Sequence, residues 1–471
     1  MMWNFNRFRN QTALICEEGR EITYGELEEM SSLLAKHLPG RSLCFNLCSN
    51  QEGSLLGYLT FINNGTVPLL LDAYLDRALL AGLIETYKPD YFWLPSSMED
   101  EFEEKFPASE PVCRYYDYSL LKTPYTKSYP LNDELALLLT TSGSTGSFKM
   151  VRQSYRNIRA NFESIVDYLQ LDETERPITT LPMSYSYGLS IINSHLSVGA
   201  SIILTSKTLV QKEFWQQFKE YEATSFGGVP YTYEILNRLN FFKMPLPSLR
   251  TMTQAGGKLS PVLHRRFAEY ALAEGKQFVV MYGQTEATAR MSYLPYEKAL
   301  EKCGSMGIAI PGGKFSLIDG EGGEIEEPDT VGELVYEGPN VTLGYAETGE
   351  DLIKEDEGQG RLVTGDLAKR DSEGFYYIVG RKKRFLKIYG SRVNLEEIEQ
   401  LIKARFEGLD CASTGVDDAM EIFVTEEGVL RAVKEFIADK TGINPVAYKV
   451  LYLESIPKNE AGKVLFNKLK S

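Results

Sequence analysis

Residues 140–149 (TTSGSTGSFK) form a run of small and hydroxylated side chains between two segments with strong apolar patterns. Before the run, residues 134–140 (ELALLLT) have the continuous apolar character of a buried strand. After it, Ser154 is placed to cap a helix, since apolar side chains recur at positions 158, 162, 165 and 169. Apolar strands alternate with helical stretches through the first part of the chain. This alternation predicts an α/β fold with a largely parallel sheet and helices on both faces.

The chain has 471 residues, too many for one hydrophobic core. Glycine and acidic residues crowd positions 312–349, which is typical of a small β-rich subdomain. A compact α+β tail follows the basic stretch at 380–384, with a helix capped by Asn394. We therefore expect a large N-terminal region of α/β sheets with a β subdomain, residues 1–382, and a small C-terminal domain, residues 383–471.

Charge and cysteine content exclude several classes of protein. Lys and Arg number 50 and Asp and Glu number 65, giving a net charge of −15, which argues against a nucleic-acid partner. The sequence contains no apolar run long enough for a transmembrane helix, and its first residues lack the pattern of a secretory signal. The six cysteines are scattered without a CxxC pair, which predicts reduced thiols and a cytoplasmic protein.

The run at 140–149 has the chemistry of a phosphate-binding loop. Glycine permits tight turns and leaves backbone amides uncovered, hydroxyls add donors, and a terminal lysine adds positive charge. The pattern differs from the P-loop motif GxxxxGK[ST]. The predicted phosphate-binding residues are Thr140, Thr141, Ser142, Gly143, Ser144, Thr145, Gly146 and Lys149.

Three further motifs carry nucleotide chemistry. In residues 281–287 (MYGQTEA), Tyr282 can stack on a purine, Thr285 can donate to a phosphate and Glu286 can hold Mg²⁺. The second motif comprises residues 364–366 (TGD) and 377–381 (YIVGR). In it, Asp366 can accept hydrogen bonds from a ribose diol, and Arg381 can pair with ribose or phosphate. The third is residues 457–463 (PKNEAGK), which end in a lysine near the C-terminus.

In this order and spacing the four motifs resemble the adenylate-forming superfamily, which includes acyl-CoA synthetases, aryl-CoA ligases, peptide-synthetase adenylation domains and luciferase. The resemblance extends from about residue 23 to residue 469, and segments 255–258 (AGGK) and 332–345 also fit. It implies that a carboxylate attacks the α-phosphate of Mg·ATP, which releases pyrophosphate and forms an acyl-adenylate. A thiol, from CoA or from carrier-protein phosphopantetheine, then displaces AMP.

The resemblance also implies roles for individual residues. Lys463 bridges the carboxylate and ATP, and its positive charge offsets the repulsion between two anions. Lys387 acts in a second, thioester-forming orientation, which the small mobile C-terminal domain reaches by turning about Lys383. Thr141 and Glu286 are expected to be catalytic, with Glu286 as the Mg²⁺ ligand. Besides the phosphate loop, the expected ATP-binding residues are Gly256, Gly257, Tyr282, Gly283, Gln284, Thr285, Glu286, Asp366, Arg381 and Lys463.

The acid-binding pocket departs from the family pattern, because Tyr185 stands where many acyl- and aryl-CoA ligases have histidine, and Phe148 replaces the usual proline of the loop. No aspartate lies between positions 181 and 189 to hold an ammonium group, which disfavours α-amino acids. The predicted pocket residues are Tyr185, Tyr187, Gly188, Pro230, Tyr231 and Gly256, with Tyr233 and Met291 as further candidates.

The sequence thus favours an AMP-forming acyl- or aryl-CoA ligase that uses ATP, Mg²⁺ and CoA. Four alternatives stay open. The acceptor can be a free-standing acyl carrier protein, the acid can be an amino acid as in peptide synthetases, the chain can be an inactive adenylate-binding homologue, or it can be a luciferase-like oxygenase. The intact Lys149, Glu286, Asp366, Arg381 and Lys463 argue against the inactive homologue, and no sequence feature favours the oxygenase.

Overall fold

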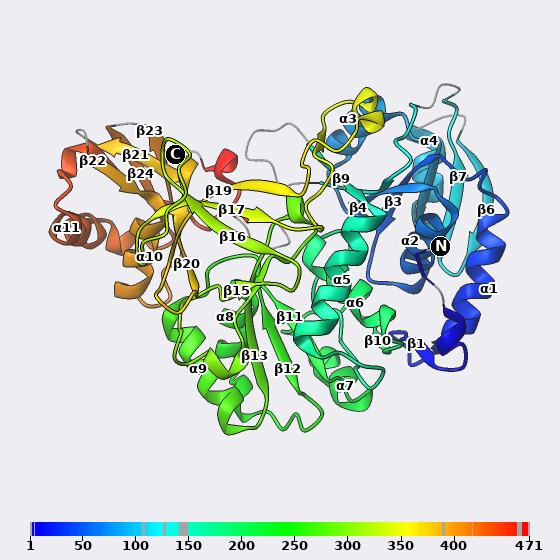
Figure 1. Cartoon of the computed structure of the whole chain (residues 1–471), viewed down its shortest axis with the longest axis horizontal. Helices are drawn as coiled ribbons and strands as arrows, with labels where there is room; N and C mark the ends of the chain where they lie inside the picture. The colour runs from blue at the N-terminus through cyan, green and yellow to red at the C-terminus, as the bar shows by residue number, and fades with distance from the viewer. Residues whose placement is uncertain are drawn as a thin grey trace.

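The computed structural model describes residues 2–3, 5–105, 109–125, 129–140, 149–388, 391–416, 418–458 and 464–469. It confirms the predicted α/β class, with a large sheet-rich N-terminal part and a smaller C-terminal part (Figure 1). Among the described residues, no helix is long and apolar enough to cross a membrane.

The largest sheet has eight strands in the order β18-β9-β8-β4-β3-β5-β7-β6. Its four central strands are parallel, and the pairings toward both edges are antiparallel, so the predicted largely parallel sheet is confirmed only at its centre. Its strands are β3 (Leu43–Cys48), β4 (Val67–Asp72), β5 (Tyr91–Pro95), β6 (Glu110–Tyr115), β7 (Tyr118–Lys122), β8 (Leu135–Thr140), β9 (Met150–Ser154) and β18 (Tyr345–Ala346).

Helices connect and flank these strands. The predicted N-terminal helix is confirmed, because the Thr23 hydroxyl accepts from the Glu26 amide and the Glu26 side chain accepts from the Thr23 amide in return. Ser154 caps the helix that follows β9 in the same way. The helices of this part are α1 (Tyr24–Ala35), α2 (Glu52–Asn64), α3 (Arg77–Tyr87), α4 (Glu99–Lys105), α5 (Tyr155–Leu169) and α6 (Ser186–Ser197).

A second sheet of five strands, β11-β12-β13-β14-β15, lies in the lower centre of Figure 1. Its first three strands are parallel, so their carboxyl ends meet at one edge. A separate three-stranded sheet has the order β10-β1-β2. The elements are β1 (Thr12–Ile15), β2 (Glu21–Thr23), β10 (Ile202–Ile203), α7 (Lys212–Glu220), β11 (Ser225–Gly228), α8 (Pro230–Arg238), β12 (Thr251–Gln254), α9 (Pro261–Ala273), β13 (Gln277–Tyr282), β14 (Ser292–Tyr293) and β15 (Ile308–Ala309).

The predicted β-rich region forms an antiparallel sheet, β16-β17-β19-β20. Its strands are β16 (Lys314–Ile318), β17 (Gly332–Glu337), β19 (Arg361–Arg370) and β20 (Tyr376–Arg381). The C-terminal part has its own apolar core around Ile402, Ile422 and Ile437. Its elements are β21 (Phe385–Ile388), β22 (Ser391–Asn394), α10 (Leu395–Arg405), β23 (Cys411–Val416), β24 (Ala419–Val424), α11 (Leu430–Thr441) and β25 (Tyr448–Tyr452).

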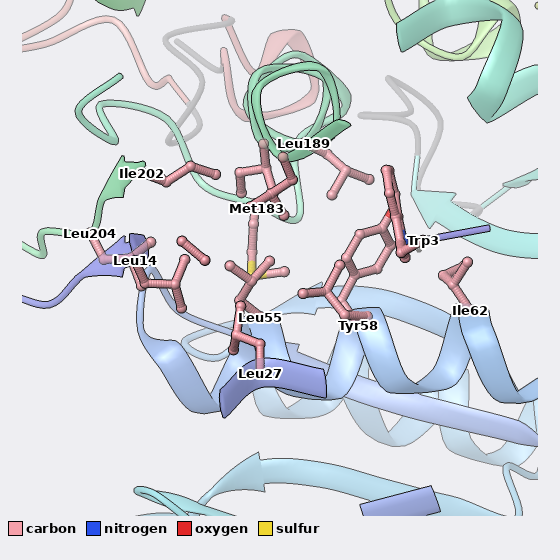
Figure 2. Packing of buried hydrophobic residues seen from close by; sticks show 14 of the residues in the cluster. Trp3, Leu14, Leu27, Leu55, Tyr58, Ile62, Met183, Leu189, Ile202 and Leu204 are labelled. Atoms are coloured by element: carbon pink, nitrogen blue, oxygen red, sulfur yellow. The ribbon is translucent and has the colours of Figure 1, made fainter. Parts of the chain in front are cut away.

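The N-terminal core fixes the segment that leads into α6. Figure 2 shows Met183 and Leu189 packed over Leu55 and Tyr58 of α2 and Leu27 of α1. The Ser54 hydroxyl also donates to the Met183 sulfur at 3.0 Å. Because Met183 and Leu189 are buried on either side, the backbone of residues 184–188 is held in place at the start of α6.

His195 on α6 predicts a specific pH dependence of stability. Burial lowers its pKa from 6.5 to about 4, and its Nδ1–H donates to the Ile191 carbonyl at 2.8 Å. A depressed folded-state pKa contributes stability that is complete above pH 6.5 and is lost as pH falls toward 4. We expect the free energy of unfolding to fall between pH 7 and pH 5 by about 2 kcal/mol more in the wild type than in His195→Asn. Urea unfolding of both proteins at the two pH values measures this difference, and equal pH slopes would contradict the assignment.

Candidate functional site

A cavity of about 30 Å³ opens where the carboxyl ends of β12 and β13 meet the start of α6. In open sheets of this kind, the edge formed by the carboxyl ends of parallel strands is the usual ligand-binding edge. The cavity is lined by Tyr185, Ser186, Tyr187, Ala255, Gly256, Tyr282, Gly283, Gln284, Thr285, Ala289 and Arg290.

Asp366 gathers three of the predicted nucleotide-binding side chains beside this cavity. Its Oδ2 accepts from the Tyr282 hydroxyl at 2.5 Å and from Gln284 Nε2 at 2.9 Å, while its Oδ1 lies 3.2 Å from Arg381 Nε. Burial and the Asp366 charge raise the pKa of Tyr282 well above its usual value, so the phenol keeps its proton and donates. The structure thus joins β13 to β19 and β20 through one buried carboxylate.

Glu286 lies on the other side of Thr285, in a short 3₁₀ turn (Thr285–Ala287). Its backbone carbonyl accepts from the Thr342 amide at 3.0 Å, which fixes the turn against the chain leading to β18. Its Oε1 accepts from the Tyr345 hydroxyl at 2.8 Å, and Lys149 Nζ lies 5.5 Å from the centre of the Tyr345 ring. A carboxylate held in this way is a hard oxygen donor of the type Mg²⁺ prefers, so the residues present fit that ion.

Gly256 has no space for a side chain. Its φ of +81° is a left-handed conformation, and a Cβ there would lie 2.6 Å from the Tyr185 hydroxyl. The Thr285 and Ser186 hydroxyls lie 3.2 Å apart on the same cavity wall. Two hydroxyl groups that can donate hydrogen bonds therefore line the wall at this point.

The family model described as "AMP-binding enzyme" matches residues 93–346, more than half of the chain. The chain belongs to this family. The resemblance inferred from the four motifs is thereby confirmed at the level of the family.

Curated relatives carry the names of CoA ligases. The chain is 31% identical over 348 residues to the peroxisomal OPC-8:0-CoA ligase 1 of Arabidopsis thaliana, a match that covers 71% of this chain and 63% of the relative. It is 30% identical to an oxalate–CoA ligase of the same plant, over 70% of this chain and 66% of the relative. The matches thus span slightly less than two thirds of these relatives' own lengths.

Solved structures share the fold of this AMP-binding family member. The structure of o-succinylbenzoate coenzyme A synthetase from Bacillus subtilis in complex with AMP superposes with a TM-score of 0.82 at 21% identity. The superposition covers 99% of this chain and 97% of that one. At this identity the likeness establishes the fold, including the smaller C-terminal part.

The predicted phosphate loop lies largely outside the described residues. Thr141, Ser142, Gly143, Ser144, Thr145 and Gly146 fall there, as does Lys463, and the side chains of Lys383 and Lys387 are not described either. The described ends of the loop add one element to the prediction. The strand β9 stands between the loop and α5, paired antiparallel with β8; the sequence predicted the helix that Ser154 caps but did not identify this strand. All five β9 side chains are buried, which favours a strand within the sheet.

Three of the six predicted pocket residues line the cavity, namely Tyr185, Tyr187 and Gly256. The other three lie outside it. Gly188 packs so tightly on the Pro182 carbonyl that a Cβ would lie 2.3 Å from it, whereas Pro230 begins α8 and its ring faces Gly257.

The remaining pocket candidates have other environments. Tyr231 is 44% exposed, with Lys458 Nζ 5.4 Å from its ring centre. Tyr233 and Met291 are buried in two separate apolar cores. Aromatic character alone therefore did not distinguish lining residues from core residues.

The sequence analysis missed Arg290, which lines the cavity and is 2% exposed. Its Nε donates to the Ser190 hydroxyl at 3.0 Å and its Nη1 to the Tyr168 hydroxyl at 3.0 Å. Its guanidinium also lies 5.3 Å from the centre of the Tyr187 ring. The available signal was a single arginine three residues after the end of the 281–287 motif, followed by Met291 and Ser292.

Proposed function

We propose that the protein is an ATP-dependent, AMP-forming acid–CoA ligase that makes an acyl-adenylate, releases pyrophosphate and transfers the acyl group to CoA. The observation that carries this proposal is the convergence of Tyr282, Gln284 and Arg381 on the buried Asp366 beside a cavity. Membership of the AMP-binding family and the names of the curated relatives support it.

In the proposed adenylation step, the enzyme positions two anions and neutralises their charge. Asp366 and Arg381 hold the ribose, Tyr282 stacks on adenine, and Thr285 contacts the α-phosphate. Glu286 is the ligand for Mg²⁺, which when bound neutralises phosphate charge. The loop from Thr140 to Lys149 holds the β- and γ-phosphates, with Gly256, Gly257 and Gly283 leaving room for the backbone to approach the nucleotide.

The proposal includes two domains, residues 1–382 and 383–471, which turn about Lys383 between the half-reactions. Lys463 acts in the first orientation and Lys387 in the second. We also propose a cytoplasmic location, because all six cysteines are free thiols.

The test is ATP–pyrophosphate exchange with a panel of aliphatic, aryl, dicarboxylic and amino acids, followed by thioester assays with CoA and with phosphopantetheinylated carrier protein. We expect exchange with one class of non-amino acid and an acyl-CoA product. ATP binding without exchange for any acid would overturn the proposal in favour of an inactive homologue. Transfer to the carrier protein alone would overturn CoA as the acceptor.

Gly256→Ala should lower kcat/KM for the acid by about 10²-fold, because its Cβ would displace the Tyr185 hydroxyl. In the double variant with Tyr185→Phe we expect partial recovery, since the next ring atom lies 3.8 Å from that Cβ while Val229 Cγ1 remains at 3.1 Å. Gly275→Ala is the matched control, because φ there is +63° and no atom lies within 4 Å of its Cβ. If the double variant is no better than Gly256→Ala, the loss comes from backbone strain or from Val229, and the assignment to the Tyr185 hydroxyl is wrong.

A further inference from the structure

Arg290 and Arg152 are both buried in the N-terminal part, but they differ in their partners. Both Arg152 and Arg290 are fully buried. Arg152 Nη2 lies 2.7 Å from a Glu357 carboxylate oxygen. Among the described residues, no carboxylate lies within ion-pair distance of Arg290, whose contacts are two hydroxyls, a thioether and an aromatic ring. A buried cation with only neutral neighbours is costly, so its position in a binding cavity indicates an anionic ligand.

The hydrogen-bond pattern leaves one nitrogen of the guanidinium group, Nη2, for such a ligand. Nε and Nη1 carry the hydrogen bonds to Ser190 and Tyr168, and within the described part of the chain Nη2 makes none. Arg290 lines the same cavity as Gly256 and the segment from Tyr282 to Thr285. A hydrogen bond from a guanidinium N–H to a carboxylate is charge-assisted and stronger than one to a neutral acceptor.

We propose that the acid substrate is a short dicarboxylic acid, whose distal carboxylate binds Arg290 while the other carboxylate is adenylated. This inference rests on the proposed function and names its substrate class. Tyr185 and Tyr187 line the same small cavity as Arg290, and a small cavity favours a short linker between the two carboxylates. A monocarboxylic acid of equal length would leave the arginine unpaired and more deeply desolvated, and an amino acid would place an ammonium group beside it.

The first test uses the wild-type protein and calorimetric binding of acyl-sulfamoyl adenosines, non-reactive mimics of the acyl-adenylate. Matched pairs of three to six carbons differ only in a terminal carboxylate or methyl group, such as butanedioic against butanoic acid. We expect the dicarboxylic member of at least one pair to bind about 30-fold more tightly, equivalent to about 2 kcal/mol. Equal or tighter binding of every methyl member overturns this inference and leaves the proposed function standing. Failure of all the mimics to bind also overturns this inference, whereas the exchange panel described above tests the proposed function separately.

The second test asks whether Arg290 carries the preference. Arg290→Met should abolish the affinity ratio within the best pair, and Arg290→Lys should retain part of it. Arg431→Met, a change at a 91% exposed arginine on α11, is the control and should leave the ratio unchanged. The ratio is measured on one folded sample, so a general loss of stability does not imitate the effect. If Arg290→Met weakens both members equally, the residue is only a structural support and the inference is overturned.

Discussion

Replacing Glu286 by glutamine should lower the rate of ATP–pyrophosphate exchange by about 10²- to 10³-fold. Glutamine keeps the shape of the side chain and an oxygen that can accept from the Tyr345 hydroxyl, which lies 2.8 Å from Oε1. It removes the negative charge on which Mg²⁺ binding depends. The loss should therefore lessen as the Mg²⁺ concentration is raised, while the melting temperature changes little.

Glu347→Gln is the matched control for this prediction. Glu347 is an exposed carboxylate in the same region, and it pairs with Lys149 at 2.6 Å. Exposed ion pairs of this kind contribute little, so exchange should stay within about twofold of the wild type. Equal losses in the two variants, or a loss in Glu286→Gln that Mg²⁺ does not relieve, would argue against a metal-binding role for Glu286.

The sequence predicted nucleotide-binding residues and helix caps well, because both depend on short motifs. Tyr282 and Asp366 are far apart in the chain, yet both were predicted to contact one nucleotide, and the structure places them in hydrogen-bond contact. Capping residues Thr23 and Ser154 were likewise predictable, because a cap depends on three or four neighbouring residues. Local patterns of this kind depend little on the rest of the fold.

Long-range pairing was harder to predict. The strand β9 is five residues long and lacks the alternation of a half-exposed strand, because both of its faces are covered. It also contains Arg152, a charged residue that the sequence alone would place on the surface. In the structure this side chain is buried and donates to backbone carbonyls near β18 and to Glu357. Only the tertiary pairing with β8 and β18 identifies the segment as a strand.

For a related reason, only three of the six predicted pocket residues line the cavity. A tyrosine has the same appearance in sequence whether it lines a cavity, as Tyr185 does, or packs in a core, as Tyr233 does. The direction of α8 decides the difference, since Pro230 starts the helix and the next residue, Tyr231, lies in solvent. The sequence analysis missed Arg290 because the residue stands out only by its lack of a carboxylate partner among the described residues. The spatial neighbours of a side chain cannot be read from its neighbours in the sequence.

Lys463→Ala should reduce adenylate formation by about 10³-fold while sparing thioester formation from a supplied acyl-adenylate. The lysine itself lies outside the described residues, but its flanks are placed. Lys458 and Val464 pair as a β-bridge, and Lys458 Nζ lies 5.4 Å from the Tyr231 ring centre, next to Pro230 and Gly257. The described flanks of the 457–463 motif thus lie close to Tyr231 at the start of α8.

The selectivity of this loss is the informative quantity. A cation that offsets the repulsion between carboxylate and ATP matters only while both anions are present, so it has no role once the adenylate exists. Lys468→Ala, at an exposed lysine of the same C-terminal segment, should leave both half-reactions unchanged. Pyrophosphate exchange measures the first half-reaction, and AMP release from added acyl-adenylate and CoA measures the second. Equal loss of both in Lys463→Ala would show that the lysine supports the fold or the closed arrangement of the domains, and would remove the basis for two catalytic orientations.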